Sequence, residues 1–290
     1  MKQHDMRNSR VIGAVAIVKE SRSAILGLAI VVLLVILAIF APWLSPNDPT
    51  EVCLGDRLIS PFTESKYPLG TDHLGRCVLS RLLYGARVSL AVGIAIVGIS
   101  TVIGVALGVV SGYYGGIFDS AIMRLVDGTL SLPSIFLAVV IAGMLGRGLA
   151  SIMIALVAIE WTSYARVARG SVLSLMEKEF VESARSLGAR DSYIMTRHIL
   201  PNIIAPVIVV ATIGMAYVIL AAAALSFLGF GAQPPTPEWG AMLNAGRVYM
   251  RTEPYLTILP GFAIMLLVLA FNLLGDGLRD ILDPRRVVVE

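Results

Sequence analysis

One acidic residue stands deep within an apolar stretch, and it is the side chain best placed to do chemistry. Glu160 interrupts the run Ile-Ala-Leu-Val-Ala-Ile-Glu-Trp-Thr-Ser-Tyr, which otherwise has the composition of a membrane-spanning helix. A carboxylate at membrane depth is costly and normally faces a cavity or a partner. Two interpretations stay open. Glu160 lines a substrate pathway and attracts a cationic group, or it lies near the cytoplasmic end of its span and is satisfied by water or by an arginine.

The motifs of ATP hydrolysis, metal binding and nucleophilic catalysis are missing from the sequence. None of its four lysines stands in the Gly-Lys-Ser/Thr sequence of a phosphate-binding loop, so we expect this chain to bind no cofactor and to hydrolyse no ATP. His4, His73 and His198 are far apart, so we expect no metal site. A nucleophile elbow and a His-Glu-x-x-His helix are also missing. The sequence therefore gives little support to an intramembrane enzyme.

The two cysteines, Cys53 and Cys77, both follow the first apolar run. An even number of cysteines in an oxidising compartment permits a disulfide, and closing a loop of this size would stabilise the fold by about 3 kcal/mol. Two free thiols are also consistent with the sequence, because the geometry of pairing cannot be read from spacing.

The composition is that of a membrane protein. Hydrophobic residues make up 57% of the 290 residues, charged residues only 15%, and the mean hydropathy is +0.81. A soluble domain of this length needs a far more polar surface, whereas this length suffices for about six membrane-spanning helices. The net charge of +3 and the few lysines argue against a nucleic-acid partner.

Apolar runs predict the helices. Four runs are clear: 24–44, 88–113, 203–230 and 255–274. Between them, residues 117–168 divide into a short polar-edged helix at 117–130, a span near 132–145 and another near 149–168, with Gly146-Arg147-Gly148 as the turn. We therefore predict an all-α membrane protein with six transmembrane helices.

Basic residues predict the orientation. Six spans place both termini on one side, together with residues 112–131 and 166–202, and that side carries 15 of the 23 lysines and arginines. The positive-inside rule assigns it to the cytoplasm. The predicted order is a cytoplasmic segment at 1–23, the first transmembrane helix at 24–44 and an extracytoplasmic segment at 45–87. A five-helix core follows at 88–276, and a cytoplasmic tail at 277–290.

Three glycines share one face of the second span. Gly104, Gly108 and Gly112 recur every four residues, which lets another helix approach closely. The partner is another helix of this chain or a helix of a second subunit, and the sequence leaves both alternatives open.

The charged stretch at 166–202 interrupts the apolar chain. Within it come Glu182-Ser183-Ala184, then Gly188, then Leu200-Pro201. Residues 177–187 can form a helix that Gly188 ends in the left-handed conformation, and Asp191 can cap the next short helix. Pro201 then stops that helix or kinks the entry to the fifth span.

This order and spacing resemble the cytoplasmic loop of the membrane subunits of binding-protein-dependent ABC importers. Further matches resemble the dipeptide/oligopeptide/nickel branch, and its C-type permease in particular, with a MetI-like, type I importer fold. They are Leu69-Gly-Thr-Asp72, Gly75-Arg76, Ser80-Arg81, Gly85-Ala-Arg-Val-Ser-Leu90, Arg124-Leu-Val-Asp127, Leu132-Pro133, the run from Ser226 to Gly240, the run from Phe271 to Asp280, and Leu282-Asp-Pro-Arg285. Ser183, His198 and Cys77 depart from the pattern, which has alanine, isoleucine and aspartate there.

The resemblance implies a multi-pass permease in the inner membrane of a bacterial or archaeal cell, surrounded by lipid. Its implied partners are a homologous second permease in a heterodimer, an extracytoplasmic binding protein, and two ATP-binding subunits that hold ATP and Mg. The coupling loop is the implied contact with those subunits, with Glu182, Ala184 and Gly188 in the helix that docks on them. Trp239, in a rigid proline-rich outer segment, is expected to anchor at the interface or to dock the binding protein.

The substrate is not determined by any residue of the chain. Di- and oligopeptides are our first expectation, with nickel or a metal chelate and glutathione as alternatives within the same machinery. A stand-alone secondary transporter that uses Glu160 as a proton relay is the alternative of a different class, and a membrane-embedded enzyme or assembly factor is another.

Overall fold

The computed structural model describes residues 22–282, and that part of the chain is helical apart from loops and one isolated bridge between Thr71 and Cys77. The predicted segments 1–23 and 277–290, and the Leu282-Asp-Pro-Arg285 motif, fall partly outside these residues. The elements in chain order are α2 (Arg22–Ile39), α3 (Ala41–Leu44), η1 (Leu54–Asp56), α4 (Val78–Tyr114), α5 (Gly116–Leu130), α6 (Ser134–Leu145), α7 (Leu149–Met176), α8 (Glu179–Ser186), α9 (Asp191–Tyr193), η2 (Ile194–Ile199), α10 (Leu200–Phe227), α11 (Trp239–Gly246), η3 (Arg247–Tyr249) and α12 (Tyr255–Leu282).

Five helical segments are long and apolar enough to cross a membrane: α2, α4, α7, α12 and the segment from α9 through α10. The span predicted near 132–145 is shorter than expected, because α6 has 12 residues. Such a helix is about 18 Å long, against a hydrocarbon core of about 30 Å. α5 and α6 are bent by 91° at Pro133, and only together do they qualify as a sixth span.

Helix α4 begins ten residues earlier than the apolar run at 88–113 predicts. Its first turns carry two arginines, Arg81 and Arg87, and Arg81 is only 4% exposed. The Arg81 guanidinium donates to the carbonyl oxygens of Pro49 at 3.0 Å and Pro235 at 3.4 Å. Hydropathy does not detect this part of the helix because protein, rather than lipid, surrounds it.

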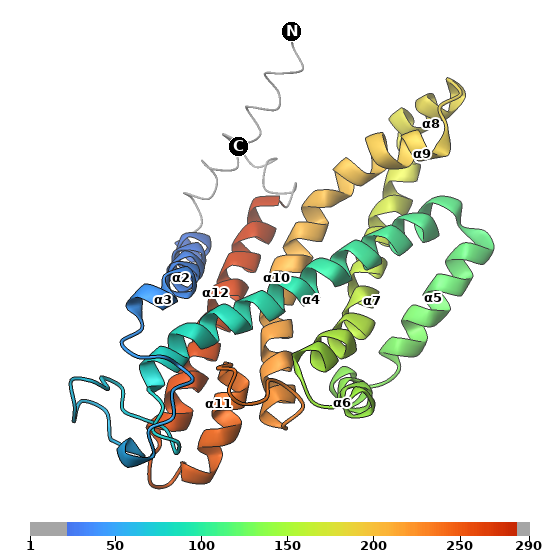
Figure 1. Cartoon of the computed structure of the whole chain (residues 1–290). Helices are drawn as coiled ribbons and strands as arrows, with labels where there is room; N and C mark the ends of the chain where they lie inside the picture. The colour runs from blue at the N-terminus through green and yellow to red at the C-terminus, as the bar shows by residue number, and fades with distance from the viewer. Residues whose placement is uncertain (1–21, 283–290) are drawn as a thin grey trace.

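The glycine face of α4 packs on α7, which it meets in Figure 1 near the middle of the molecule. A Cβ atom added at Gly104 or Gly108 would overlap a backbone carbonyl of α7, and one at Gly112 would lie 2.8 Å from the Cβ of Val172. The intramolecular alternative is therefore confirmed: the small residues let two helices of one chain touch along their backbones.

α2 packs along α12 at the edge of the bundle (Figure 1). A Cβ atom at Gly277 would overlap Ala24, and one at Gly27 would lie 2.7 Å from the carbonyl oxygen of Ala270. The first residues of α2 thus lie beside the last turns of α12, so both described ends of the chain are at the same end of the bundle.

The α4–α7 contact makes a prediction with a control in the same helix. We expect Gly108→Ala to destabilise the protein by about 1–3 kcal/mol, because the new methyl group overlaps a backbone oxygen that cannot move alone. Gly98→Ala, on the same helix with open space around the glycine, should be neutral or slightly stabilising. Thermal unfolding in detergent compares the two, and equal melting temperatures would contradict the packing argument.

Candidate functional site

The charged stretch at 166–202 is helical for most of its length, and α8 lies between two helical segments that are long enough to cross a membrane. α7 continues to Met176, α8 follows after a short break, and α9 and η2 lead directly into α10. In Figure 1 these elements form the projecting tip of the molecule, where α8 and α9 lie at the ends of α7 and α10.

Helix α8 is amphipathic. Val181 is 1% exposed and Ala184 is half-buried, whereas Glu182 and Ser183 are exposed. The buried face packs on an apolar cluster contributed by α4, α7, the η2 turn and α10: Val109, Tyr113, Ala168, Val172, Ile194, Ile199 and Ile203. One face of α8 therefore belongs to the core of this chain, and the other is free to contact a partner.

Gly188 ends this helix as predicted. Its φ angle is +79°, the Ala189 N–H donates to the carbonyl oxygen of Ala184 at 3.1 Å, and the Gly188 N–H donates to that of Arg185 at 3.0 Å. This is the Schellman arrangement, which satisfies the last carbonyls of a helix and reverses the chain.

Asp191 does not cap the next helix, contrary to the prediction. The N-cap of α9 is Arg190, with no side-chain cap. Asp191 instead accepts a hydrogen bond of 2.6 Å from the hydroxyl of Tyr113, and the guanidinium of Arg185 lies 5.8 Å from the Tyr113 ring centroid. Tyr113, at the end of α4, thus ties α8 and α9 to the bundle, and sequence reasoning missed it because a tyrosine ending an apolar run looks like an interfacial anchor.

Pro201 neither stops the helix nor opens a break in it. It occupies the first turn of α10, where a missing N–H is tolerated, and the six-residue π-helical segment η2 precedes it directly. His198, one of the departures from the family pattern, lies between the rings of Phe180 and Tyr193, with centroid distances of 6.1 and 5.6 Å. Leu200 and Pro201 are both exposed.

Ion pairs brace the extended end of α7 against α5. Arg169 binds Asp119 through two hydrogen bonds of 2.5 and 2.7 Å, and Ser111 of α4 donates to the same carboxylate at 2.5 Å. This bidentate, half-buried pair is the stronger kind, whereas the exposed pair between Arg166 and Asp127, at 3.2 Å, adds little.

Glu160 lies well inside α7 and is only 9% exposed. Within residues 22–282 its carboxylate makes no hydrogen bond and no ion pair, so no described arginine satisfies it. Tyr164, one turn further along α7, has a buried hydroxyl without a hydrogen-bond partner in the same part of the chain.

The outer segment is held by buried charge rather than by a disulfide. Asp72 pairs with Arg76 at 2.7 Å and with Arg81 at 3.6 Å. Cys53 and Cys77 are free thiols in the structure, which is the second of the two alternatives that the sequence leaves open. Cys53 contacts the turn through its backbone, donating to the carbonyl oxygen of Leu74 at 3.2 Å, while Cys77 is 1% exposed at the start of α4.

Trp239 is not available for docking. It is 2% exposed, its Nε1 donates to the carbonyl oxygen of Leu82 at 3.0 Å, and the ring fills the space above Gly85. Trp239 begins α11, a helix that the sequence analysis missed, and Glu238 caps it by accepting 2.8 Å hydrogen bonds from the N–H groups of Gly240 and Ala241. The expected docking role is therefore corrected to a packing role between α4 and α11.

Comparison with known proteins places these features in a family. Residues 104–288 match the model of the binding-protein-dependent transport system inner membrane component, and residues 14–61 match the N-terminal transmembrane domain of oligopeptide transport permease C. A dipeptide transport system permease protein, DppC, of Alkalihalophilus pseudofirmus is 44% identical over 92% of this chain and 87% of its own length. A glutathione transport system permease protein, GsiD, of Escherichia coli O157:H7 is 46% identical over 88% of this chain and 84% of its own.

The fold has a solved counterpart. An inward-facing structure of the MetNI methionine ABC transporter matches with a TM-score of 0.57 at 20% identity, over 70% of this chain and 97% of that one. The helical architecture is thus the MetI-like one that the resemblance implied. On the family models and on relatives more than 40% identical over most of its length, this chain belongs to the multi-pass inner-membrane permease components of binding-protein-dependent ABC importers.

Proposed function

We propose that this chain imports di- or oligopeptides as one half of a heterodimeric permease, driven by two separate ATP-binding subunits and supplied by an extracytoplasmic binding protein. The observation that carries the proposal is helix α8, which has Val181 in the core of this chain and Glu182 exposed at the projecting tip. A helix that binds a partner and transmits its movement needs one face packed on its own chain and another exposed to the partner, and α8 has both. ATP and Mg belong to the partner subunits in this proposal, and the chain itself holds no cofactor.

Peptides are the preferred substrate because of the relatives. Two of the relatives are named for dipeptides and for di- and tripeptides, at 44% identity each. The glutathione relative, at 46%, transports a compound that is itself built of amino acids, so glutathione stays the alternative. None of the relatives named here is a nickel transporter, so nickel is a less favoured substrate than either peptides or glutathione.

The contacts of α8 connect it to the long helices of the bundle, so a displacement of α8 would be transmitted to them. α8 shares its apolar cluster with α4, α7 and α10, and the hydrogen bond between Tyr113 and Asp191 adds a polar tie to α4. Movement of α8 by the ATP-binding subunits would therefore move three long helices together. That coupling is suited to alternating access, in which the pore opens to one side at a time.

We also propose six spans with both termini in the cytoplasm. The bent pair of α5 and α6 supplies the sixth span, and the two described ends of the chain lie at the same end of the bundle. The excess of lysine and arginine in the segments at that end supports its cytoplasmic placement.

Glu182→Arg tests the coupling role. We expect ATP-driven dipeptide uptake by the reconstituted importer to fall by at least about tenfold, since reversing an exposed charge at an interface costs over about 1.4 kcal/mol of binding where the partner is complementary. The melting temperature of the permease should not change, because the side chain is exposed. Glu179→Arg, at another exposed glutamate of the same helix, is the matched control, and equal losses of uptake in both variants would contradict a specific role for Glu182.

Glu160→Gln tests the pathway role and the proton-relay alternative together. A carboxylate lining the pathway should favour cationic cargo, so we expect uptake of lysyl-alanine to fall more than uptake of alanyl-alanine. Unchanged uptake of both peptides would show that Glu160 does not line the pathway. Uptake by the unmodified importer that runs without ATP and follows a proton gradient would instead support the secondary transporter.

A further inference from the structure

A polar cavity of about 510 Å³ lies at the end of the bundle opposite α8. Its wall is built from the outer segment, the turn between α6 and α7, the loop after α10, and the α11–η3 region. Four arginines line it: Arg76, Arg81, Arg147 and Arg247. No aspartate or glutamate within residues 22–282 is part of the lining.

The charges of this cavity are only partly neutralised. Arg76 and Arg81 are each 4% exposed and share one carboxylate, that of Asp72. Arg147 and Arg247 form no ion pair with a described residue. Glu238, the other buried carboxylate near this wall, is engaged by the N–H groups of Gly240 and Ala241, so Arg147 and Arg247 remain two positive charges that no described carboxylate pairs with.

The remaining polar groups can donate or accept hydrogen bonds without adding charge. His73 stacks on Tyr249 with ring centroids 5.7 Å apart and 18° between the planes. Burial lowers the pKa of His73 below its usual value, which favours the neutral form of this imidazole. The volume lies within the range of small-molecule sites, about 300–1,000 Å³.

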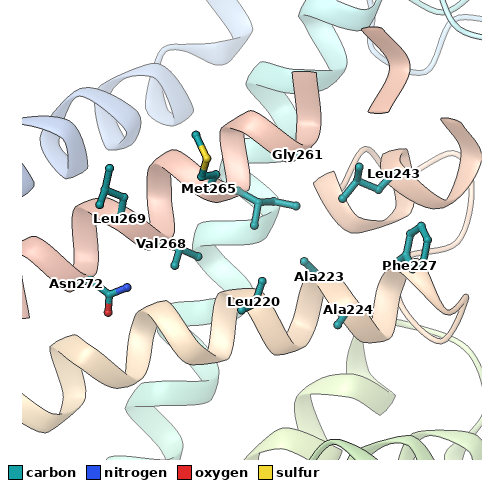
Figure 2. A pocket seen from close by; sticks show the side chains of 11 residues that line it. Leu220, Ala223, Ala224, Phe227, Leu243, Gly261, Met265, Val268, Leu269 and Asn272 are labelled. Carbon is teal, nitrogen blue, oxygen red and sulfur yellow. The ribbon is translucent and has the colours of Figure 1, made fainter. Parts of the chain in front are cut away.

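The cationic cavity adjoins an apolar groove. The Arg247 guanidinium lies 5.9 Å from the ring centroid of Phe227. Phe227 also lines a groove of about 620 Å³ between α10, α11 and α12, whose wall is otherwise almost wholly aliphatic; Figure 2 shows Phe227 and Leu243 at one end of it and Asn272 at the other. A ligand with an anionic end and an apolar body would fit here, with the anionic end in the cavity and the apolar body in the groove.

We propose that the cavity around Arg147 and Arg247 binds a carboxylate of the transported substrate at the outer mouth of the permease. The anionic character of the ligand follows from the uncompensated arginines, and its identification with a peptide carboxylate rests on the proposed function. An acidic side chain of the binding protein would offer the same chemistry. The concave, small-molecule volume and the adjoining apolar groove favour the substrate.

The charge of the cavity can be measured on the full-length chain in lipid nanodiscs, without ATP. Thr236, a half-buried residue of the cavity wall, is changed to cysteine, and its modification by an anionic sulfonatoethyl methanethiosulfonate is compared with that by the cationic trimethylammonioethyl reagent. Thr63→Cys, at an exposed position of the outer segment away from this wall, normalises the intrinsic reactivities. The parent chain, with Cys77 buried and Cys53 half-buried, supplies the background.

We expect the anionic reagent to be favoured at Thr236→Cys by at least about tenfold over the ratio at Thr63→Cys, because a cationic cavity concentrates anions. The double variant Arg147→Gln/Arg247→Gln should remove most of this preference. Arg251→Gln removes the same charge at an exposed residue that is not part of the lining, and it should leave the preference intact. A ratio equal to that at Thr63→Cys, or an equal loss in Arg251→Gln, would overturn the anion site.

The ligand is then tested by protection. Millimolar alanyl-alanine should slow the modification of Thr236→Cys severalfold, whereas alanyl-alaninamide, which lacks the carboxylate, should not. Equal protection by both peptides, or protection only by the ligand-free binding protein, would overturn the assignment to a substrate carboxylate. These measurements need no ATP-binding subunit, so their failure leaves ATP-driven uptake as an independent test of the importer, and a failed uptake assay leaves the charge of the cavity unaffected.

Discussion

The close contact between α4 and α7 is the constraint on which most of the arrangement depends. In lipid, apolar side chains gain nothing by leaving the solvent, so helices associate through dense packing and through polar contacts. Gly104, Gly108 and Gly112 remove the side chains that would keep the two backbones apart, and Ser111 and Arg169 add a polar junction through Asp119 at the same end. Because α7 is fixed in this way, the position of Glu160 along it and the direction in which it carries α8 are fixed as well.

The apolar cluster beneath α8 continues this packing to the end of the bundle that carries α8. Val109 and Tyr113 belong to the last turns of α4, and Ala168 and Val172 to the neighbouring turns of α7. Val181 of α8 packs on the surface that these residues form. A short helix of eight residues is not stable by its own hydrogen bonds, so its orientation comes from this burial and from the turn at Gly188.

Hydropathy and small-residue spacing predicted the long helices and the glycine face because both depend on contact with lipid or on close helix packing. The prediction failed where protein replaces lipid. The start of α4 and the helix α11 pack against other parts of the chain, with Arg81 and Trp239 buried, so a search for long apolar runs does not detect them. Trp239 was misjudged for the same reason: an aromatic residue in a proline-rich outer loop resembles an interfacial anchor, and only the absence of a side chain at Gly85 makes room to bury it. The role of Tyr113 depends on a contact with Asp191 across 78 positions of sequence, which spacing cannot show.

The two ends of the bundle differ in whether their charged side chains are exposed or buried. At the tip that carries α8, the charged groups are mostly exposed: Glu182, Arg185 and the pair of Arg166 with Asp127 all face solvent. Exposed charges cost little to re-pair, so this end can exchange solvent for a partner without breaking its own fold. At the other end, Asp72 and its two arginines are buried, and removing one of them would leave an uncompensated charge in the protein. The outer segment is therefore held by buried ion pairs within this chain, which do not depend on contact with a partner.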